Sequence, residues 1–274
     1  IRDAVEGSVT GQAVIQSDSG GGPPLPIPAA AAKEIAGTRG VSSVAAVRFG
    51  RARIGGGTVD VTGVDRRTFG DVYRLEWQEG SAETLERLTA GEILVGKDYA
   101  EENGIGVGDT IVLETQRRPE ASFTVAGITD DESGLVGDLT VSLEAMESSF
   151  GQRDDAFLMA AFDAPEDRHE KLRSEIAAEL DRKYPGLRVE STGEFVERQQ
   201  GQVDQLLNFV YGLLAMSIIV SLLGIVNTLV LSISERVREL GLLRAVGMSR
   251  RQVRRMIRYE AVITALIGSA LGMV

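Results

Sequence analysis

Few residues of this sequence have the type and spacing that chemistry needs. The 274-residue chain contains one histidine, His169, and no cysteine. This composition excludes thiol catalysis, thiolate metal sites and disulfide bonds, and it leaves almost nothing from which to build a histidine metal cage or a catalytic triad. His169 falls on the polar side of a predicted helix, where we interpret it as a solvated surface residue. The sequence therefore predicts no catalytic residue, no metal site and no bound cofactor.

Two other groups of residues have a suitable type for ligand binding but not the spacing. The Gly-Ile-Gly-Val-Gly segment at 104–108 lacks the glycine spacing and the following helix of a dinucleotide-binding fingerprint, and Asp109 after it indicates a turn into a strand. The acidic runs at 130–132 and 154–155 lack the alternating ligands of a calcium loop, so we expect solvated loops. The sequence has no GxxxxGK[ST] phosphate loop, which excludes ATP hydrolysis by a Walker-type site on this chain.

Charge is distributed unevenly along the chain. The total is −11, and residues 204–274 contribute +4 from eight arginines and four acidic residues, which leaves −15 on residues 1–203. The near-zero mean hydropathy of +0.01 therefore averages two unlike parts. An acidic chain with a pI of about 4.8 repels nucleic acids, so we expect no nucleic-acid partner.

The sequence predicts a transmembrane helix in the stretch 205–234, where 30 consecutive positions carry no charge. About 20 apolar residues cross a bilayer at a rise of about 1.5 Å per residue, so this run is long enough to span it. The alternative is a core helix of a soluble domain, but such helices seldom run this long without a charge. Gly212, Gly224 and Asn227 are candidate positions for packing against a neighbouring membrane helix.

A second apolar run over 261–274 is too short to span a membrane alone, and we interpret it as the start of a further membrane helix, in a fragment of a larger multi-pass membrane protein. All eight arginines of the second part lie between the two apolar runs. By the positive-inside rule, 234–258 is cytoplasmic and 1–200 extracytoplasmic, with the plasma membrane and its lipid between them.

The part outside the membrane, 1–190, is predicted to be an α+β domain in one or two lobes. One helix starts at Pro28 and ends near Gly37 or Gly40, and a second covers 165–184. The second helix has apolar residues at four-residue steps, which predicts a buried face of Leu172, Ile176, Leu180 and Tyr184. The predicted strands are 8–17, 41–49, 58–64, 73–77, 93–95, 110–113, 123–128, 139–141, 156–162 and 187–189.

The segment 191–233 is predicted to be a stalk that continues into the membrane helix. Ser191 and Glu194 have the spacing of a helix capping box, and apolar residues follow at steps of three and four. An unbroken helix over 194–233 is about 60 Å long, and only about half of it fits the hydrocarbon core. We therefore expect the remainder to project outward and to join the outer domain to the membrane.

The basic segment 234–258 is predicted to form two short helices. The first has an apolar face and ends at Gly247, and Ser249 caps the second. An ordinary basic loop held against anionic lipid explains such a segment, and so does a docking element for a cytoplasmic partner. The residues themselves leave both interpretations open, and 259–274 then begins the next membrane helix.

The stretch SERVRELGLLRAVGMSRRQVRRMIRYEAVITALIGSALG, 234–272, resembles the core signature of FtsX-like (MacB/LolC-type) ABC transporter permeases. The matching positions are Glu235, Arg236, Glu239, Leu240, Gly241, Leu243, Arg244, Ala245, Gly247, Ser249, Gln252, Val253, Glu260, Gly268 and Gly272. Upstream, GEILVGKDYAEENGIGVGDTIVLETQ at 91–116 and Phe-Thr-Val-Ala-Gly at 123–127 are similar to the extracytoplasmic core domain of that family.

The resemblance implies a non-catalytic permease subunit with two partners. These are a cytoplasmic ABC ATPase subunit, on which ATP is hydrolysed, and a second permease copy in a homo- or heterodimer. It also implies that closure of the ATPase is transmitted to the outer domain, a mechanotransmission that exports or releases substrate outside the membrane. The residues that the resemblance implies for coupling to the ATPase are Glu239, Leu240, Leu243, Arg244, Ala245, Gly247 and Met248, with Leu243 and Met248 as apolar anchors.

Two other classes of function stay open from the residues alone. One is a membrane-anchored sensor or receptor that binds a ligand outside the membrane and works without an ATPase. The other is an extracytoplasmic enzyme, against which the shortage of catalytic residue types argues. A further membrane helix on each side of the segment, together with an adjacent ATPase gene, separates the permease from the sensor.

Overall fold

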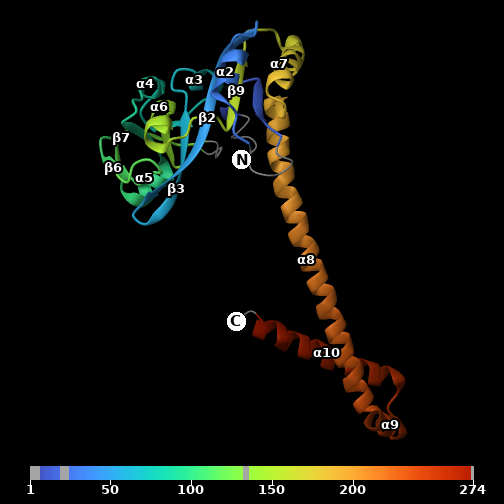
Figure 1. Ribbon diagram of the computed structural model, residues 1–274. Coiled ribbons are helices and arrows are strands. Elements are labelled where there is room, and N and C mark those ends of the chain that lie inside the picture. Colours follow the sequence, from blue (N-terminus) through green and yellow to red (C-terminus); the bar gives the residue numbers. More distant parts are fainter. Residues whose placement is uncertain (1–6, 19–24, 132–135, 273–274) are drawn as a thin grey trace. The chain divides into compact units, whose positions relative to one another are not determined.

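A computed structural model describes residues 7–18, 25–131 and 136–272, apart from the side chains at 199–206, 233, 239, 264, 270 and 271. The chain divides into two compact units. The first unit is Ile1–Gln202 and contains all the strands, and the second unit is Val203–Val274 and is helical. Figure 1 shows both units, with many of their helices and strands labelled.

The first unit is built on one mixed sheet, which confirms the α+β prediction (Figure 1). The strand order is β10-β1-β9-β2-β3-β8-β5-β7-β4, and β6 pairs with β7. Neighbours are antiparallel except for the pairs β3–β8 and β5–β7. The strands are β1 Ala13–Ser17, β2 Val41–Ile54, β3 Gly57–Val64, β4 Trp77–Glu79, β5 Glu92–Gly96, β6 Thr110–Leu113, β7 Ala121–Thr129, β8 Leu139–Ser142, β9 Phe157–Phe162 and β10 Leu187–Glu190.

The longest element of the sheet is the hairpin of β2 and β3, which runs in register from Val47↔Val64 to Ile54↔Gly57. Its two-residue turn is Gly55-Gly56, with φ of +57° and +88°. Two-residue hairpin turns with positive φ at both positions match the twist of the strands, and glycine adopts them without steric cost. Part of β2, 43–48, is buried on both faces rather than half-buried as the alternation predicted, because helices cover both sides of it.

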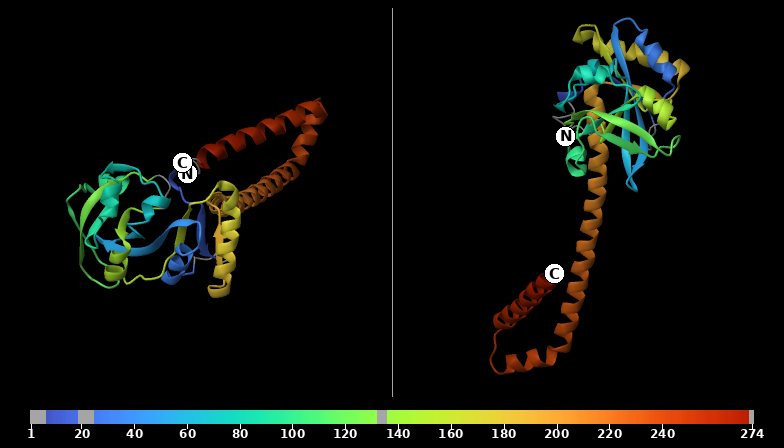
Figure 2. Two further views of the ribbon diagram at one scale, coloured as in Figure 1. Left: turned by 90° about the horizontal axis from the view of Figure 1, so that it is seen from above. Right: turned by 90° about the vertical axis from the view of Figure 1, so that its left-hand side faces the viewer.

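Helices α2 (Ala29–Ala36) and α7 (His169–Lys183) cover one face of β1, β9 and β2, as the views in Figure 2 show. Pro28 precedes α2 and Gly37 follows it, which confirms the predicted start and end. Leu172, Ile176 and Leu180 are each at most 3% exposed, which confirms the predicted buried face of α7, whereas Tyr184 follows the last residue of the helix and is half-buried. They pack with residues of α2 and of the three strands into one apolar cluster.

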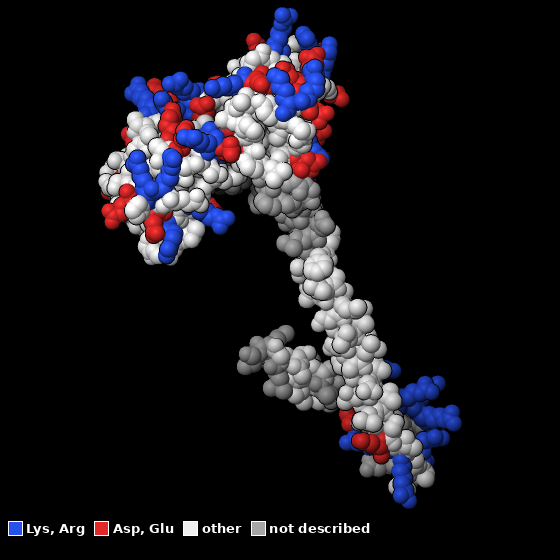
Figure 3. Space-filling model, viewed as in Figure 1, with Lys and Arg blue, Asp and Glu red and all other residues white. Residues whose placement is uncertain are grey.

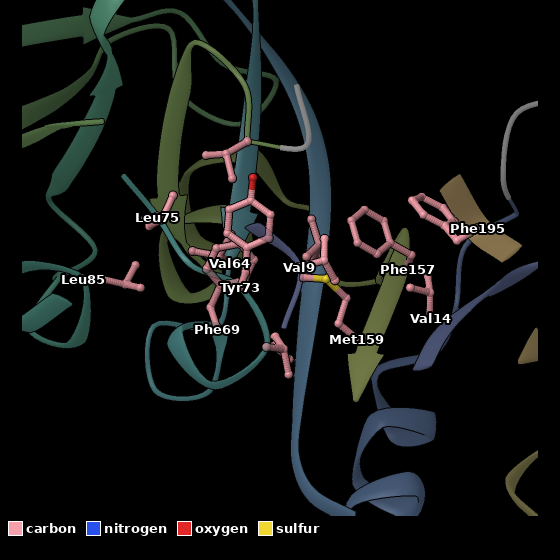
Figure 4. Packing of buried hydrophobic residues seen from close by; sticks show 14 of the residues in the cluster. Val9, Val14, Val64, Phe69, Tyr73, Leu75, Leu85, Phe157, Met159 and Phe195 are labelled. Carbon is pink, nitrogen blue, oxygen red and sulfur yellow. The ribbon is translucent and has the colours of Figure 1, made fainter. Parts of the chain in front are cut away.

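The opposite face of the same strands packs against a second cluster, shown in Figure 4. Val14, Phe157 and Met159 project from the strands into it, and Phe69 and Tyr73 stack with ring centroids 5.0 Å apart. Each strand therefore contributes alternate residues to the two clusters, as the period of two in a strand requires. A third cluster lies between the other half of the sheet and the segment 143–150.

The position of Gly127 in the sheet explains why the Phe-Thr-Val-Ala-Gly segment ends in glycine. It lies in β7, where the pairing with β5 shifts register. A Cβ atom at this position would lie 2.9 Å from the backbone oxygen of Glu79 and 3.1 Å from the ring of Trp77, both on the neighbouring strand β4. Only glycine permits this close approach of β4, so the motif glycine has a packing role in the sheet.

Several sequence predictions in the first unit were wrong. The strand predicted over 8–17 begins only at Ala13, and the one predicted over 73–77 is instead β4, Trp77–Glu79. Four short helices were missed, because three to seven residues are too few to show a helical period. They are α3 Phe69–Val72, α4 Ala82–Glu86, α5 Lys97–Asn103 and α6 Leu143–Ala145, which continues into a π-helical turn over Met146–Phe150.

Asp155 and His169 differ from the prediction of solvated residues, whereas Asp154 is exposed as predicted. Asp155 is 1% exposed and pairs with Arg48, and Asp130 pairs with Lys97 at 3.0 Å, while Glu132 lies outside the described residues. His169 is half-buried, with its Nε2 2.8 Å from the carbonyl oxygen of Ala164. Lone polar residues pack into a core when a partner from elsewhere in the chain reaches them, and the sequence does not display such partners. By contrast, the predicted turn at 104–108 is confirmed, since it leads directly into β6.

The second unit consists of helix α8 from residue 203 onward, α9 and α10. Helix α8 as a whole is Thr192–Glu235, α9 is Val237–Ala245 and α10 is Arg250–Gly272. The segment Leu207–Ser232 is the one candidate membrane span among the described residues, with a mean hydropathy of 2.5 and no buried residue. Figure 3 shows this uncharged stretch and the arginines gathered around α9 and the start of α10.

The buried ion pair of Arg48 and Asp155 fixes β2 to the segment before β9. The Nε of Arg48 donates to Oδ1 of Asp155 at 2.7 Å, and the backbone of Asp155 pairs with Ile27. Burial raises the pKa of Asp155 above its usual value, and the hydrogen bond and charge of Arg48 offset this only in part. A buried ion pair of this kind adds little net stability, but removing one of its two side chains leaves the other charge buried without a partner.

We expect Asp155→Ala to lower the free energy of unfolding by about 3 kcal/mol or more, because Arg48 then stays buried and unpaired. The double variant Arg48→Met/Asp155→Ala is expected to lose clearly less, since it buries no charge. Denaturant unfolding of the purified protein, followed by circular dichroism, measures both. A double variant that is less stable than Asp155→Ala would contradict this role for the pair.

Candidate functional site

The start of α8 is held by the capping box that the sequence predicted. The backbone N–H of Ser191 donates to Oε2 of Glu194 at 2.8 Å, and the N–H of Glu194 donates back to Oγ of Ser191 at 3.2 Å. These hydrogen bonds satisfy two backbone groups that have no partner within the helix. The hydrogen bonds from the backbone and hydroxyl of Ser191 lower the pKa of Glu194 below its usual value. The first turn of α8 therefore has a fixed position on the first unit.

Apolar packing fixes the next turn of α8 in the core of the first unit. Phe195 and Val196 are 6% and 4% exposed, and the ring of Phe195 lies 6.3 Å from that of Phe157 on β9 (Figure 4). The hydroxyl of Thr192 donates to the carbonyl oxygen of Gly11 at 2.6 Å. Burying one phenylalanine contributes roughly 1.5–3 kcal/mol, so this contact is a strong attachment for a single helix turn.

A cluster of charges completes the attachment on the other side of the helix. Glu190, at the end of β10, is 4% exposed and accepts a hydrogen bond from Arg198 of α8. Arg188 approaches the same carboxylate at 3.8 Å. We call Glu190, Ser191, Glu194, Phe195 and Arg198, with their contacts, the joint of α8. The sequence showed the capping box but not Glu190 or Arg198, because their pairing spans a strand and a helix.

At its other end, α8 leads through Arg236 into α9 and α10. The Nη1 of Arg236 lies 2.9 Å from Oε1 of Glu260 on α10, with both side chains about half-exposed. A groove of about 780 Å³ lies between α8, α9 and α10, and its walls are mostly apolar. Gly224, one of the three predicted packing residues, lines the groove, but neither Gly224 nor Gly212 has another atom within 4 Å of a Cβ position, and Asn227 is exposed.

The turn between α9 and α10 has a specific geometry that explains its glycine. The N–H of Met248 donates to the carbonyl oxygen of Leu243, and the N–H of Gly247 donates to that of Arg244, both at 3.1 Å. This is the Schellman pattern of a helix end, and it requires the positive φ of +110° that Gly247 has. Ser249 then caps α10 as predicted, in a capping box with Gln252.

The predicted coupling residues divide into two groups in the structure. Leu240 and Leu243 line the groove, and Leu243 and Met248 occupy the two positions that a Schellman turn commonly pairs through an apolar contact. Arg244 and Ala245 are exposed, and the side chain of Glu239 lies outside the described residues. The most exposed apolar residues of this region are Leu242 at 64% and Val246 at 89%, and sequence analysis named neither. The sequence feature that could have identified Leu242 and Val246 is their spacing of four residues, which places both on the face of α9 that does not line the groove.

These features define a class of protein, an α+β domain attached by one long helix to a candidate membrane span. Residues 1–179 match the MacB-like periplasmic core domain, and residues 211–274 match the FtsX-like permease C-terminal region. The chain belongs to the MacB-like, FtsX-type family of ABC transporter permeases.

One curated relative is a macrolide export ATP-binding/permease protein, MacB, from Shewanella sp. (strain ANA-3). It is 23% identical over 263 residues, which cover 86% of this chain and 37% of that relative. The chain likewise spans well under two thirds of the length of the other curated relatives it matches over long stretches. The name of the Shewanella relative joins an ATP-binding part to a permease part, and the matched residues cover 37% of that protein.

Two solved structures have the same fold as the first unit. The periplasmic region of MacB from Actinobacillus actinomycetemcomitans has a TM-score of 0.51 at 14% identity, over 72% of this chain and 95% of that one. The extracellular domain of the transporter YknZ from Gram-positive bacteria has a TM-score of 0.50 at 16% identity, over 65% and 98%. At these identities the comparison establishes the fold of the domain.

The lowered pKa of Glu194 makes the joint sensitive to acid. A carboxyl whose pKa is lower in the folded than in the unfolded protein stabilises the fold at pH values above its unfolded pKa of about 4.3. This contribution is lost as the pH falls through the lowered pKa of the folded protein. Glu194→Gln keeps the hydrogen bonds of the box but cannot titrate. We therefore expect wild type to melt at a higher temperature than Glu194→Gln at pH 7 and at the same temperature near pH 2.

Thermal unfolding at a series of pH values measures this difference. Glu197→Gln is the matched control, because it removes the same charge from the same turn without a contact to the box. An equal separation of wild type and Glu194→Gln at all pH values would show that the carboxylate of Glu194 does not stabilise the joint.

Proposed function

We propose that this chain transmits ATP-driven motion from a cytoplasmic ATPase to the domain outside the membrane, as the permease of an ABC transporter. The observation that supports this most is the continuity of α8. Its first turns are buried in the core of the first unit through Phe195 and Val196, and its last turn leads into the exposed helix α9. One helix therefore carries a buried attachment at one end and a docking surface at the other.

The distribution of charge supports the direction of this arrangement. Eight arginines follow the candidate span and the first unit is strongly acidic, and by the positive-inside rule this supports a cytoplasmic α9 and a first unit outside the membrane. In this proposal the apolar part of α10 enters the membrane as well, which makes the chain multi-pass. Gly212, Gly224 and Asn227 then face neighbouring membrane helices, of this chain or of a second permease copy.

The docking surface for the ATPase is the exposed side of α9 and the turn that follows it. Leu242 and Val246 supply apolar contacts that fit a groove on a partner, and Arg244 supplies a charge at its border. Leu240, Leu243, Gly247 and Met248 hold α9 in place against α8 and α10. Glu239 contributes polar contacts that set the register. ATP hydrolysis takes place on the partner, and the substrate is moved or released on the outer side.

We expect Val246→Asp and Leu242→Asp to reduce the permease-stimulated ATPase activity of the complex at least ten-fold. A charge in a desolvated apolar contact costs about 2 kcal/mol or more at the centre of an interface. Leu243→Asp is expected to abolish coupling too, without unfolding the outer domain. Co-purification with the ATPase and measurement of ATP hydrolysis in a reconstituted membrane test this.

Val237→Asp is the matched control for Val246→Asp. Val237 is 61% exposed and lies at the start of α9, nine residues before Val246 and about half a helical turn away around the axis. It is expected to leave stimulated hydrolysis within two-fold of wild type. Wild-type stimulation by the Val246→Asp and Leu242→Asp variants would rule out this docking surface.

A further inference from the structure

Helix α10 begins with five arginines, at 250, 251, 254, 255 and 258. At about 100° per residue, these positions occupy one arc of about 140° around the helix. The first turn of α10 contains no acidic residue. In the part of the chain that the structure describes, no acidic side chain forms an ion pair with any of the five. Their charge is therefore available to a ligand outside this chain.

Three of the arginines share one line along α10 with exposed apolar residues. Arg251, Arg255 and Arg258 continue at steps of three and four into Val262 and Leu266. Residues at this spacing lie above one another on a helix. Val262 is 49% exposed and Leu266 is 65% exposed, so this side of α10 is uncovered along its whole length. We call these five residues the outer stripe of α10.

The other two arginines lie on a different line. Arg250 and Arg254 continue at the same steps into Ile257, Ala261 and Ala265, and the last three line the groove between α8, α9 and α10. The apolar residues of this line therefore face the groove, whereas those of the outer stripe face away from it. The chain therefore offers two arginine pairs of equal charge on two neighbouring lines of one helix, whose centres are about 100° apart around its axis.

Tyr259 orders one guanidinium of the outer stripe. The Nη2 and Nε of Arg255 donate to the hydroxyl of Tyr259 at 2.9 and 3.2 Å, and the guanidinium carbon lies 5.4 Å from the centre of the ring. Tyrosine is enriched at the border between headgroups and hydrocarbon, because its ring is apolar and its hydroxyl is polar. Arginine stays charged at every physiological pH, and its planar donors match a phosphate.

We infer that Arg251, Arg255 and Arg258 form a binding surface for the headgroups of anionic phospholipids in the cytoplasmic leaflet. This rests on the proposed function, in which the apolar part of α10 enters the bilayer. Val262 and Leu266 then contact acyl chains, and Arg258 and Arg255 lie roughly 6 and 10 Å below Val262, at the level of the lipid phosphates. An acidic protein surface fits the arginines but not the exposed apolar residues that continue their line.

Native mass spectrometry of the full-length protein in detergent tests the proposal, with phosphatidylglycerol and phosphatidylcholine as the two probes. Each arginine near a membrane surface contributes about a five-fold gain in binding of an anionic lipid. Arg251→Gln/Arg258→Gln is therefore expected to weaken phosphatidylglycerol binding about 25-fold and to leave phosphatidylcholine binding unchanged. Arg250→Gln/Arg254→Gln, with the same loss of charge, is expected to stay within two-fold of wild type.

An equal loss of phosphatidylglycerol binding in both double variants would overturn the proposal, because net charge alone would then explain the binding. Unchanged lipid binding in Arg251→Gln/Arg258→Gln, with weaker binding of the ATPase, would assign the surface to a protein partner instead. Circular dichroism of each variant verifies that α10 is intact.

Labelling of a single cysteine separates this outcome from a failure of the proposed function. The 274 residues contain no cysteine, so Val262→Cys introduces the one thiol within them, and labelling of the membrane-embedded protein without this substitution gives the background. Protection of that thiol from a membrane-impermeant maleimide is expected. Free reaction would show that α10 does not enter the bilayer, which overturns both the multi-pass arrangement and the lipid surface. A protected thiol with no preference for phosphatidylglycerol overturns the lipid surface alone.

Discussion

The burial of Phe195 and Val196 is the contact on which the rest of the arrangement depends. A membrane helix has no need to be attached to a domain outside the bilayer, and a flexible linker would suffice to tether one. Here the apolar cluster that fills one face of the sheet also takes in the second turn of α8, and hydrogen bonds and a buried carboxylate hold the turns on either side. A motion of α8 at this end therefore requires a motion of the sheet, because separating them would expose the core.

The starts of α8 and α10 use similar devices for different purposes. Ser191 with Glu194 caps α8 in the first unit, and Ser249 with Gln252 caps α10 in the second. At the first site the capped turn is also buried in a core. At the second it lies among exposed residues, and the Schellman turn at Gly247 fixes the backbone while leaving Leu242 and Val246 uncovered. Fixed backbone with uncovered side chains is what a docking surface needs, since little conformational entropy is lost on binding.

Sequence patterns were sufficient wherever a local rule decides the structure. Uncharged length gave the membrane span, four-residue steps gave the buried face of α7, and capping residues gave the starts of α2, α8 and α10. What the patterns could not give is pairing between distant segments. Glu190 with Arg198 and Arg48 with Asp155 join residues whose types read as ordinary surface charges, and the parallel pairs β3–β8 and β5–β7 leave no mark in either strand alone. Exposure of Leu242 and Val246 likewise depends on where α8 and α10 lie.

The glycine turn of the long hairpin has a practical consequence. Neither Gly55 nor Gly56 has another atom within 4 Å of a Cβ position, and the ladder of β2 and β3 is complete on both sides of the turn. Loop tips of this kind accept inserted sequence, because lengthening a surface loop costs little closure entropy and removes no buried contact. The tip is therefore a suitable place for a peptide tag or a fluorescent label on the domain outside the membrane, far along the chain from α8.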